Sequence, residues 1–150
     1  MQKVINSVAN IEAAVFSDAW NYESITDSLK QDYNGLIIID ENSNTFIGKD
    51  IKCEGEIAGY ILYSLIMGEA ELLRIAVSEE NRKNGFASIL MDTFFGKLRE
   101  EKAEKLFLEV RADNVPAINL YKKCNFKEIA VRKNYYRNPA SDAVIMEFDF

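Results

Sequence analysis

The sequence predicts a single α/β domain built on a mixed central sheet with helices on both faces. The chain has 150 residues, 48% hydrophobic and 28% charged, which suits one domain with a full core. Segments with apolar residues at helical spacing alternate with short apolar runs typical of strands. No repeat, low-complexity tract or proline-rich linker interrupts this pattern. We therefore expect one domain that covers residues 1–150.

The first half of the chain predicts two helices followed by three strands. Helical spacing and β-branched or aromatic runs place these elements as helices at 8–15 and 22–29, and strands at 35–39, 57–67 and 70–77. Residues 40–54 are polar and include Asn42, Ser43 and Gly48, so we expect a loop there. Gly68 is placed for the hairpin turn between the last two of these strands.

The second half predicts the order helix, strand, helix, strand, strand. The helix after Gly85 has one apolar face, formed by Phe86, Ile89, Leu90, Phe94 and Leu98. Asn114 is a good N-cap for the next helix, and Pro116 suits the first turn of that helix. The strands are expected at 106–111, 129–132 and 143–148, with residues 134–139 joining the last two.

The charge of the chain limits its partners. The formal net charge is −6, which argues against general binding to nucleic acid. Residues 1–80 hold 5 basic and 14 acidic groups, whereas residues 81–150 hold 13 basic and 10 acidic groups. Two solvated faces of opposite charge would explain this asymmetry. A second half that holds an anionic cofactor and a first half that faces a cationic substrate would explain it equally well.

Cysteine and histidine content limits the chemistry. Cys53 and Cys124 are too few for a disulfide framework and lack metal-binding spacing, so we expect two reduced thiols. The absence of histidine excludes histidine triads and histidine metal sites. No apolar run reaches the roughly 18 residues of a membrane span, and the N-terminus lacks the pattern of a signal peptide. We therefore expect a cytoplasmic protein that needs no metal.

The turn at residues 82–87 is a candidate anion-binding site. The strand that ends at Val77 leads to the sequence Arg82-Lys83-Asn84-Gly85-Phe86-Ala87, and a helix follows. A glycine turn before a helix points several backbone N–H groups at one place, where the helix dipole favours an anion. The turn is neither a P-loop nor a dinucleotide fingerprint. An ordinary connection with solvated Arg82 and Lys83 is the alternative.

Glu109 is the candidate general base. It lies in an otherwise apolar strand, and strand alternation puts it on the face opposite to Leu108 and Val110. Partial burial there would suit a group that accepts a proton near neutral pH. An exposed glutamate, or one paired with Arg74 or Arg111, is the alternative.

Tyr121 is the candidate general acid. It lies on the apolar face of the helix that follows Asn114, where a phenol can donate a proton to a leaving thiolate or alkoxide. A buried core tyrosine is the alternative. Cys124 lies nearby, but no histidine is present to activate it, so we expect a small buried residue and not a nucleophile.

Together these elements resemble the GNAT superfamily of acetyl-coenzyme A (acetyl-CoA)-dependent N-acetyltransferases. Residues 82–87 match its cofactor motif, in which Gln or Arg is followed after two residues by Gly-x-Gly or Gly-x-Ala, and the order of elements is that of the GNAT (acyl-CoA N-acyltransferase) fold. The closer resemblance is to the ribosomal-protein alanine N-acetyltransferases. The segments that resemble this subfamily are residues 70–77, 108–114, 117–121, Phe126 and 132–136. Residues 16–20, Phe-Ser-Asp-Ala-Trp, are also similar to that subfamily's Phe-Ser-x-Pro-Trp.

The resemblance implies a role for each candidate residue. Glu109 would act as base on an incoming α-ammonium group, and Tyr121 would protonate the departing coenzyme A thiolate. Backbone groups at 75–77 would contact the acetyl carbonyl and the pantetheine arm, and those at 83–88 would hold the pyrophosphate. The implied cofactor-binding residues are Ile75, Ala76, Val77, Arg82, Lys83, Asn84, Gly85, Phe86, Ala87, Ser88 and Asn114.

The resemblance also implies an acceptor, the N-terminal alanine of a small-subunit ribosomal protein, which is a basic partner. A GNAT enzyme for a small amine or another peptide N-terminus is the alternative, because residues 40–54 and 136–142 depart from the subfamily pattern. A non-catalytic acyl-CoA-binding module is a third possibility. The presence of both Glu109 and Tyr121 argues against it, since binding alone needs neither.

Overall fold

The computed structural model describes residues 1–150 as four α-helices, a short 3-10 helix and one seven-stranded sheet. The helices are α1 (Gln2–Val15), α2 (Tyr22–Lys30), η1 (Glu79–Asn81), α3 (Phe86–Glu100) and α4 (Val115–Lys123). The strands are β1 (Asn34–Asp40), β2 (Thr45–Ile47), β3 (Ile57–Ile66), β4 (Glu69–Val77), β5 (Lys105–Arg111), β6 (Lys127–Arg137) and β7 (Ala140–Asp149). No helix combines the length and the apolar character that crossing a membrane requires.

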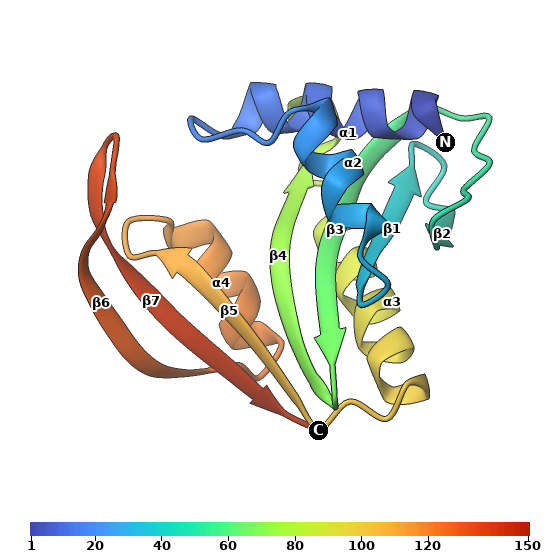
Figure 1. The fold of residues 1–150 in the computed structure, drawn as a ribbon. Coiled ribbons are helices and arrows are strands. Elements are labelled where there is room, and N and C mark those ends of the chain that lie inside the picture. The colour runs from blue at the N-terminus through green and yellow to red at the C-terminus, as the bar shows by residue number, and fades with distance from the viewer.

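The sheet carries helices on both faces, as predicted (Figure 1). The strand order is β2-β1-β3-β4-β5-β7-β6, and only the β4–β5 pair is parallel. α1 and α2 pack on one face, where Val8, Ile25 and Tyr60 are fully buried. α3 and α4 pack on the other face, around Phe94 and Tyr121. On the face that carries α1 and α2, no helix covers β5, β7 and β6 (Figure 1).

The parallel pair is very short, and this opens the sheet in its middle. Only residues 69–71 of β4 pair with residues 105–107 of β5. Beyond them β4 stays paired with β3, and β5 with β7, so the two halves of the sheet diverge as a V (Figure 1). A β-bulge at Leu73, which has no partner in β3, bends β4 where the gap begins. The inner edges of the V are therefore left without a partner strand.

Residues 40–54, predicted from the sequence to be a loop, contain a short strand. Thr45–Ile47 forms β2, which pairs with β1 at the edge of the sheet. The buried carboxylate of Asp40 accepts hydrogen bonds from the backbone N–H groups of Asn42 and Asn44, both at 2.9 Å. These bonds turn the chain back on itself and bring β2 alongside β1.

β6 and β7 are longer than the expected strands at 129–132 and 143–148. They extend until only Asn138 and Pro139 separate them, so residues 134–137 are strand and not connection. Every residue of β6 except Tyr136 is exposed. Hydrogen bonding to β7 forms this strand without an apolar pattern that would mark it in the sequence.

Candidate active site

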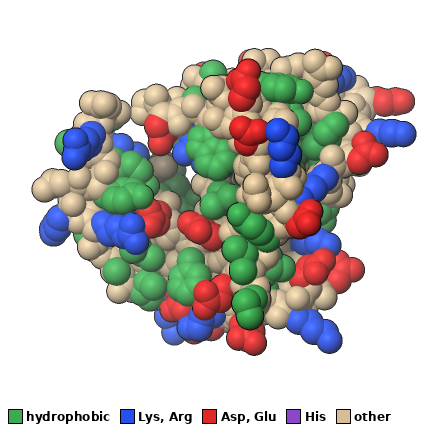
Figure 2. All heavy atoms as spheres, in the orientation of Figure 1, with side chains coloured by type: hydrophobic (Ala, Val, Ile, Leu, Met, Phe, Trp, Pro, Cys, Tyr) green, Lys and Arg blue, Asp and Glu red, His purple; other side chains and the backbone are tan.

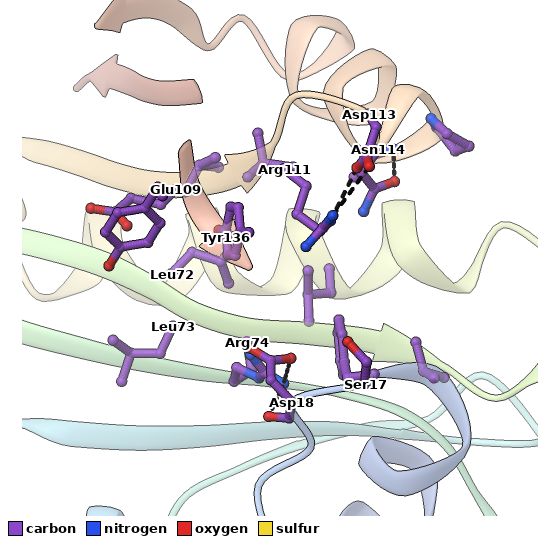
Figure 3. A pocket seen from close by; sticks show the side chains of 18 of the residues that line it. Ser17, Asp18, Leu72, Leu73, Arg74, Glu109, Arg111, Asp113, Asn114 and Tyr136 are labelled. Carbon is purple, nitrogen blue, oxygen red and sulfur yellow. Dashed lines mark hydrogen bonds and ion pairs between the residues drawn. The ribbon is translucent and has the colours of Figure 1, made fainter. Parts of the chain in front are cut away.

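A cavity of about 810 Å³ lies between the diverging strands β4 and β5. Its other walls come from the segment after α1, the start of α4 and the β6–β7 turn (Figure 3). Figure 3 places Glu109 and Tyr136 on one side of the cavity, and Arg74 and Asp18 on the opposite side. The volume is typical of sites for cofactors and drug-sized ligands.

The turn before α3 presents free backbone donors, as predicted for an anion site. Gly85 is the N-cap of α3 and has a φ of +74°, a left-handed conformation that favours glycine. The first bond of α3 runs from the Ile89 N–H to the Gly85 carbonyl, and the N–H groups of residues 83–88 bond to nothing in the protein. A side chain at Gly85 would begin in open space, with no atom within 4 Å. The free donors and the helix dipole suit a phosphate group.

Glu109 lies where the two halves of the sheet begin to part. Its side chain points away from the buried residues of β5 and is 27% exposed. The carboxylate pairs with Arg132 of β6 at 3.3 Å, and not with Arg74 or Arg111. Glu109 is thus a partly desolvated carboxylate in the cavity wall, with a partner on the neighbouring strand.

Three tyrosines line the same cavity as Glu109, and for two of them, Tyr121 and Tyr136, the surroundings shift the pKa. Tyr121 of α4 is 5% exposed, and burial raises the pKa of its hydroxyl above the ordinary value. That hydroxyl makes no hydrogen bond within the protein and is not among the fully buried polar atoms that lack a partner, while the ring packs on Phe126 with the centroids 5.6 Å apart. Burial and the charge of Glu109 also raise the pKa of Tyr136. Both phenols are therefore protonated at neutral pH and able to donate a proton.

The cavity unites only some of the predicted residues, namely Ile75, Glu109, Asn114 and Tyr121. Ala76 and Val77 pack in the two cores beside their partners in β3. Phe86 is 6% exposed, so its side chain belongs to the core. Only its backbone N–H, which has no hydrogen-bond partner in the protein, is available to a ligand. Asn114 caps α4 by accepting a hydrogen bond from the Ala117 N–H at 3.2 Å, as predicted. The free donors of residues 83–88 lie outside the cavity lining, beyond the end of β4.

A buried ion pair holds the segment after α1 against β4. Glu12 is fully buried, and its carboxylate accepts hydrogen bonds from the Arg74 guanidinium at 2.7 and 3.0 Å. It also accepts one from the Tyr60 hydroxyl and one from the Trp20 N–H, the latter at 3.0 Å. The guanidinium stacks on Phe16, 4.1 Å from the ring centroid. We call this set of contacts the Glu12–Arg74 clamp; it anchors the cavity wall at residues 16–20.

The β6–β7 turn meets this wall across the cavity. The Ser17 hydroxyl donates to the Asn138 carbonyl at 3.2 Å, and Arg111 donates to the Pro139 carbonyl at 2.7 Å. The Arg111 guanidinium also lies over the Tyr136 ring, 4.9 Å from its centroid. No site role was predicted for these residues from the sequence. Ser17 and Asn138 are 121 residues apart in the chain, so no local pattern could have paired them.

This arrangement suits transfer of a group between two substrates that meet in the cavity. The free N–H groups of residues 83–88 lie beyond one end of the cavity and can bind a phosphate. Inside the cavity, a carboxylate can accept a proton and phenols can donate one. Cys124 is outside the lining, and burial followed by the charge of Asp92 raises the pKa of its thiol. Because no activated nucleophile lines the cavity, the site favours direct transfer without an acyl-enzyme.

Known proteins are similar to this chain in sequence and in fold. The profile of the Acetyltransferase (GNAT) family matches residues 5–126. A Bacillus subtilis (strain 168) protein, provisionally named ribosomal protein bS18-alanine N-acetyltransferase, is 32% identical over 143 residues, which are 95% of this chain and 87% of that protein. The crystal structure of the ribosomal-protein-S18-alanine N-acetyltransferase from Escherichia coli has a TM-score of 0.82 at 23% identity, with 99% of this chain and 89% of that chain covered.

A third similar protein is described with both of its ligands. It is the NatC complex bound to Gag peptide and CoA, with a TM-score of 0.76 at 18% identity over 97% of this chain and 91% of that chain. The two crystal structures support the fold, and the Bacillus subtilis relative confirms the resemblance to ribosomal-protein alanine N-acetyltransferases. The chain therefore belongs to the GNAT family and is an N-acetyltransferase that uses acetyl-CoA.

Proposed function

We propose that this enzyme acetylates the α-amino group of a protein N-terminus, specifically the N-terminal alanine of a small-subunit ribosomal protein. The observation that carries the proposal is the cavity between β4 and β5, where Glu109 and Tyr121 line one space beside unpaired strand edges. Acetyl-CoA can be held there by backbone groups, and Glu109 can deprotonate the acceptor amine beside it. This is what direct acyl transfer to an amine requires.

Acetyl-CoA would bind along the V, with its pyrophosphate on the N–H groups of residues 83–88. Those donors are free, and the open space at Gly85 lets a phosphate approach the backbone. Arg82 and Lys83 are exposed beside the turn and would add positive charge. The pantetheine amides would pair with backbone groups of residues 75–77, and the free side-chain amide of Asn114 would donate from the opposite wall. The CoA seen in the similar NatC complex supports this co-substrate.

The reaction would proceed in one displacement. Glu109 takes a proton from the α-ammonium group, directly or through water, and frees the nitrogen lone pair. The nitrogen attacks the thioester carbonyl, and a C–N bond forms as the carbonyl oxygen gains negative charge, which backbone N–H groups of β4 stabilise. The C–S bond then breaks as the carbonyl re-forms, and Tyr121 donates its proton to the departing thiolate. The nitrogen gives its second proton through water to the Tyr121 oxygen, and Glu109 releases the first proton to solvent. The products are the acetylated N-terminus and coenzyme A.

The acceptor is proposed from the names of the similar proteins and from charge. The Bacillus subtilis and Escherichia coli proteins are named for alanine acetylation of ribosomal protein bS18 or S18. Ribosomal proteins are basic because they bind RNA, and the first 80 residues of this chain hold 14 acidic and 5 basic groups. Because ribosomal proteins are made in the cytoplasm, we propose that the enzyme works there.

A small amine remains the second candidate acceptor. The Ser17–Asn138 hydrogen bond joins the two walls across the cavity and narrows the approach from that side. A closed pocket suits a small amine better than a peptide, which needs a channel. This contact is the observation that favours the alternative.

Acetyl transfer to matched acceptors would test the function. The acceptors are a short peptide that copies the N-terminus of the ribosomal protein, a lysine peptide with a blocked N-terminus, and several polyamines, with thiol release as the readout. We expect transfer to the alanine peptide alone. Turnover with the polyamines only would show that the acceptor is a small amine and not a protein N-terminus. Tight acetyl-CoA binding with no turnover on any acceptor would contradict the proposal.

A further inference from the structure

A second hollow, of about 600 Å³, adjoins the candidate active site. It lies over residues 69–71 of β4 and over β5 and β7, on the sheet face where no helix covers β5 and β7 (Figure 1), and both hollows are lined by Leu108 and Glu109. Figure 2 shows acidic and hydrophobic side chains gathered on this side of the molecule. A peptide whose amino group reaches Glu109 would find a continuous surface for the residues that follow.

This hollow, which we call the β4–β5 groove, combines apolar and charged side chains. Phe107 and Ile145 contribute the apolar part on β5 and β7, and Ile66 at the end of β3 is half exposed beside them. The charged side chains that line it are Glu69, Glu71, Glu109 and Arg132. Such a surface can hold the alkyl stem of a long side chain and pair with the charge at its tip.

The charges of the groove are not balanced. Arg132 pairs with Glu109 at 3.3 Å, whereas neither Glu69 nor Glu71 forms an ion pair. The pKa of Glu71 is raised, first by partial burial and then by the charge of Glu109, while Arg132 acts in the opposite direction. Glu71 and Glu109 therefore repel each other, and Arg132 is the only cationic side chain that lines the groove. A second cation in the groove would relieve this repulsion.

We propose that the β4–β5 groove is a subsite for the acceptor peptide, where Glu71 binds a Lys or Arg side chain a few residues after the acetylated N-terminus. This rests on the proposed function and names a residue that selects the acceptor. Three features support a peptide as the occupant: the groove continues from the base, it carries excess negative charge, and a basic ribosomal protein is its electrostatic complement. A small amine would leave the groove empty.

The test compares two peptides that differ only in charge. Both begin with alanine; one has Lys at positions 2 to 5, and the other has Gln there. Steady-state kinetics with Glu71→Gln should show a Michaelis constant for the Lys peptide that rises about fivefold, as expected for a partly solvated ion pair. The constants for the Gln peptide and for acetyl-CoA should change less than twofold. Glu41→Gln, an exposed carboxylate in the 41–44 turn, is the matched control.

Charge reversal gives a second readout. Glu71→Lys should favour a third peptide, with Glu at positions 2 to 5, over the Lys peptide. An equal rise in the Michaelis constant for the Lys and Gln peptides would overturn the subsite, because Glu71 would then act only through Glu109. No change with any peptide would overturn it too.

Two further outcomes separate this inference from its rivals. Sedimentation of the wild type and of Glu71→Lys should give the same mass, and a dimer that dissociates in the variant would assign the groove to a second copy of the chain. If the wild-type enzyme acetylates the Lys and Gln peptides equally well, the proposed function stands and the subsite proposal is overturned. A wild type that uses neither peptide contradicts both.

Discussion

At the scale of single residues, the surroundings of Glu109 decide what it can do. Strand alternation predicts its face correctly, because Leu108 and Val110 are buried and Glu109 is not. Its ion-pair partner is Arg132, and the alternatives considered from the sequence, Arg74 and Arg111, have other partners. A local pattern gives the direction of a side chain but not which strand will lie beside it.

Glu109→Gln should slow acetyl transfer most strongly near neutral pH. The α-amino group has a pKa of about 8, so at pH 7 it needs a base, and a missing general base costs roughly 100-fold or more. At pH 9 the amine is already neutral and the deficit should shrink. The pH dependence of kcat/KM measures this. Arg132→Gln removes the same ion pair and leaves the base, so it should retain most activity; equal loss in both variants would assign the effect to the pair.

Tyr121→Phe should lower kcat while sparing stability and the acceptor Michaelis constant. The hydroxyl has no partner within the protein and the ring packing is retained, so the unfolding free energy should change by less than about 0.5 kcal/mol. Because burial raises the pKa of this phenol, it stays protonated above pH 10 and should cause no loss of wild-type activity between pH 7 and 9.5.

Tyr136→Phe is the matched control for that variant, since Tyr136 lines the same cavity and also has a raised pKa. If kcat falls with Tyr136→Phe and is unchanged with Tyr121→Phe, the proton donor is Tyr136. The resemblance to the GNAT family favoured Tyr121, whereas its place on the apolar face of a helix is by itself typical of a core tyrosine. Tyr136 lies on an exposed strand of the β6–β7 hairpin, and the pairing of β7 with the distant strand β5 places this hairpin beside the cavity.

At the scale of elements, the turn into α3 is the part that the sequence predicts best. The strand, the glycine and the helix N-terminus are consecutive in the chain, so their arrangement is a local matter. Gly85 has the positive φ expected for a glycine cap, and the donors after it are free. The Asn114 cap of α4 was predictable for the same reason.

Gly85→Ala should weaken coenzyme A binding with little loss of fold. The positive φ costs an alanine about 1 kcal/mol, and the new methyl group meets no protein atom. A bound phosphate would have to move away from it, so we expect at least tenfold weaker binding by calorimetry. Gly85→Glu, which adds a negative charge, should abolish binding. Gly48→Ala, at a positive φ with open space around it, is the control for strain; equal affinity in Gly85→Ala and wild type would remove the phosphate from this turn.

The Glu12–Arg74 clamp was not predictable from spacing, because its members come from α1, β3 and β4. The same holds for the bulge at Leu73 and for β2, which depend on the partner strand or on the Asp40 turn. Helices, caps and strand faces follow from neighbouring residues. Contacts that shape the cavity walls join distant segments and became visible only in the structure.

Arg74→Lys should raise the acceptor Michaelis constant about tenfold and leave acetyl-CoA binding nearly unchanged. Lysine keeps the charge but loses the two-point contact with Glu12 and the stacking on Phe16, so the wall at 16–20 would loosen. Loss of a hydrogen bond to the buried Glu12 carboxylate should also lower the free energy of unfolding by about 2 kcal/mol. The double variant Glu12→Gln/Arg74→Gln should recover part of that stability and none of the acceptor affinity. Recovery of both together would make the clamp a purely structural feature.

At the scale of the whole molecule, the two halves of the sheet are joined by a three-residue ladder. The first half carries α1, α2 and the excess of acidic groups, and the second half carries β5 to β7. Each half contributes one wall of the cavity, and the Ser17–Asn138 hydrogen bond joins the two walls. The substrates would thus meet at the boundary between the halves.

Acetyl-CoA should stabilise the whole chain and not only the turn that holds its phosphates. A ligand that binds the folded state alone, at 100 times its dissociation constant, adds about 2.7 kcal/mol to the free energy of unfolding. Thermal unfolding with and without acetyl-CoA measures this, with Gly85→Glu as the variant expected to show no shift. An equal shift in that variant would place the ligand elsewhere.

The short ladder between β4 and β5 has a consequence for amide exchange with solvent. Beyond residues 71 and 107, the inner edges of these strands carry N–H groups that no neighbouring strand protects. In the free enzyme those amides should exchange deuterium far faster than amides paired with β3 or β7, although both kinds belong to the same strands. When the pantetheine arm occupies the gap, it should slow exchange along β4 as an added strand would. The cofactor would then take the place of the missing strand between β4 and β5. The exchange rate of each amide along these strands would show how far into the V the pantetheine arm extends.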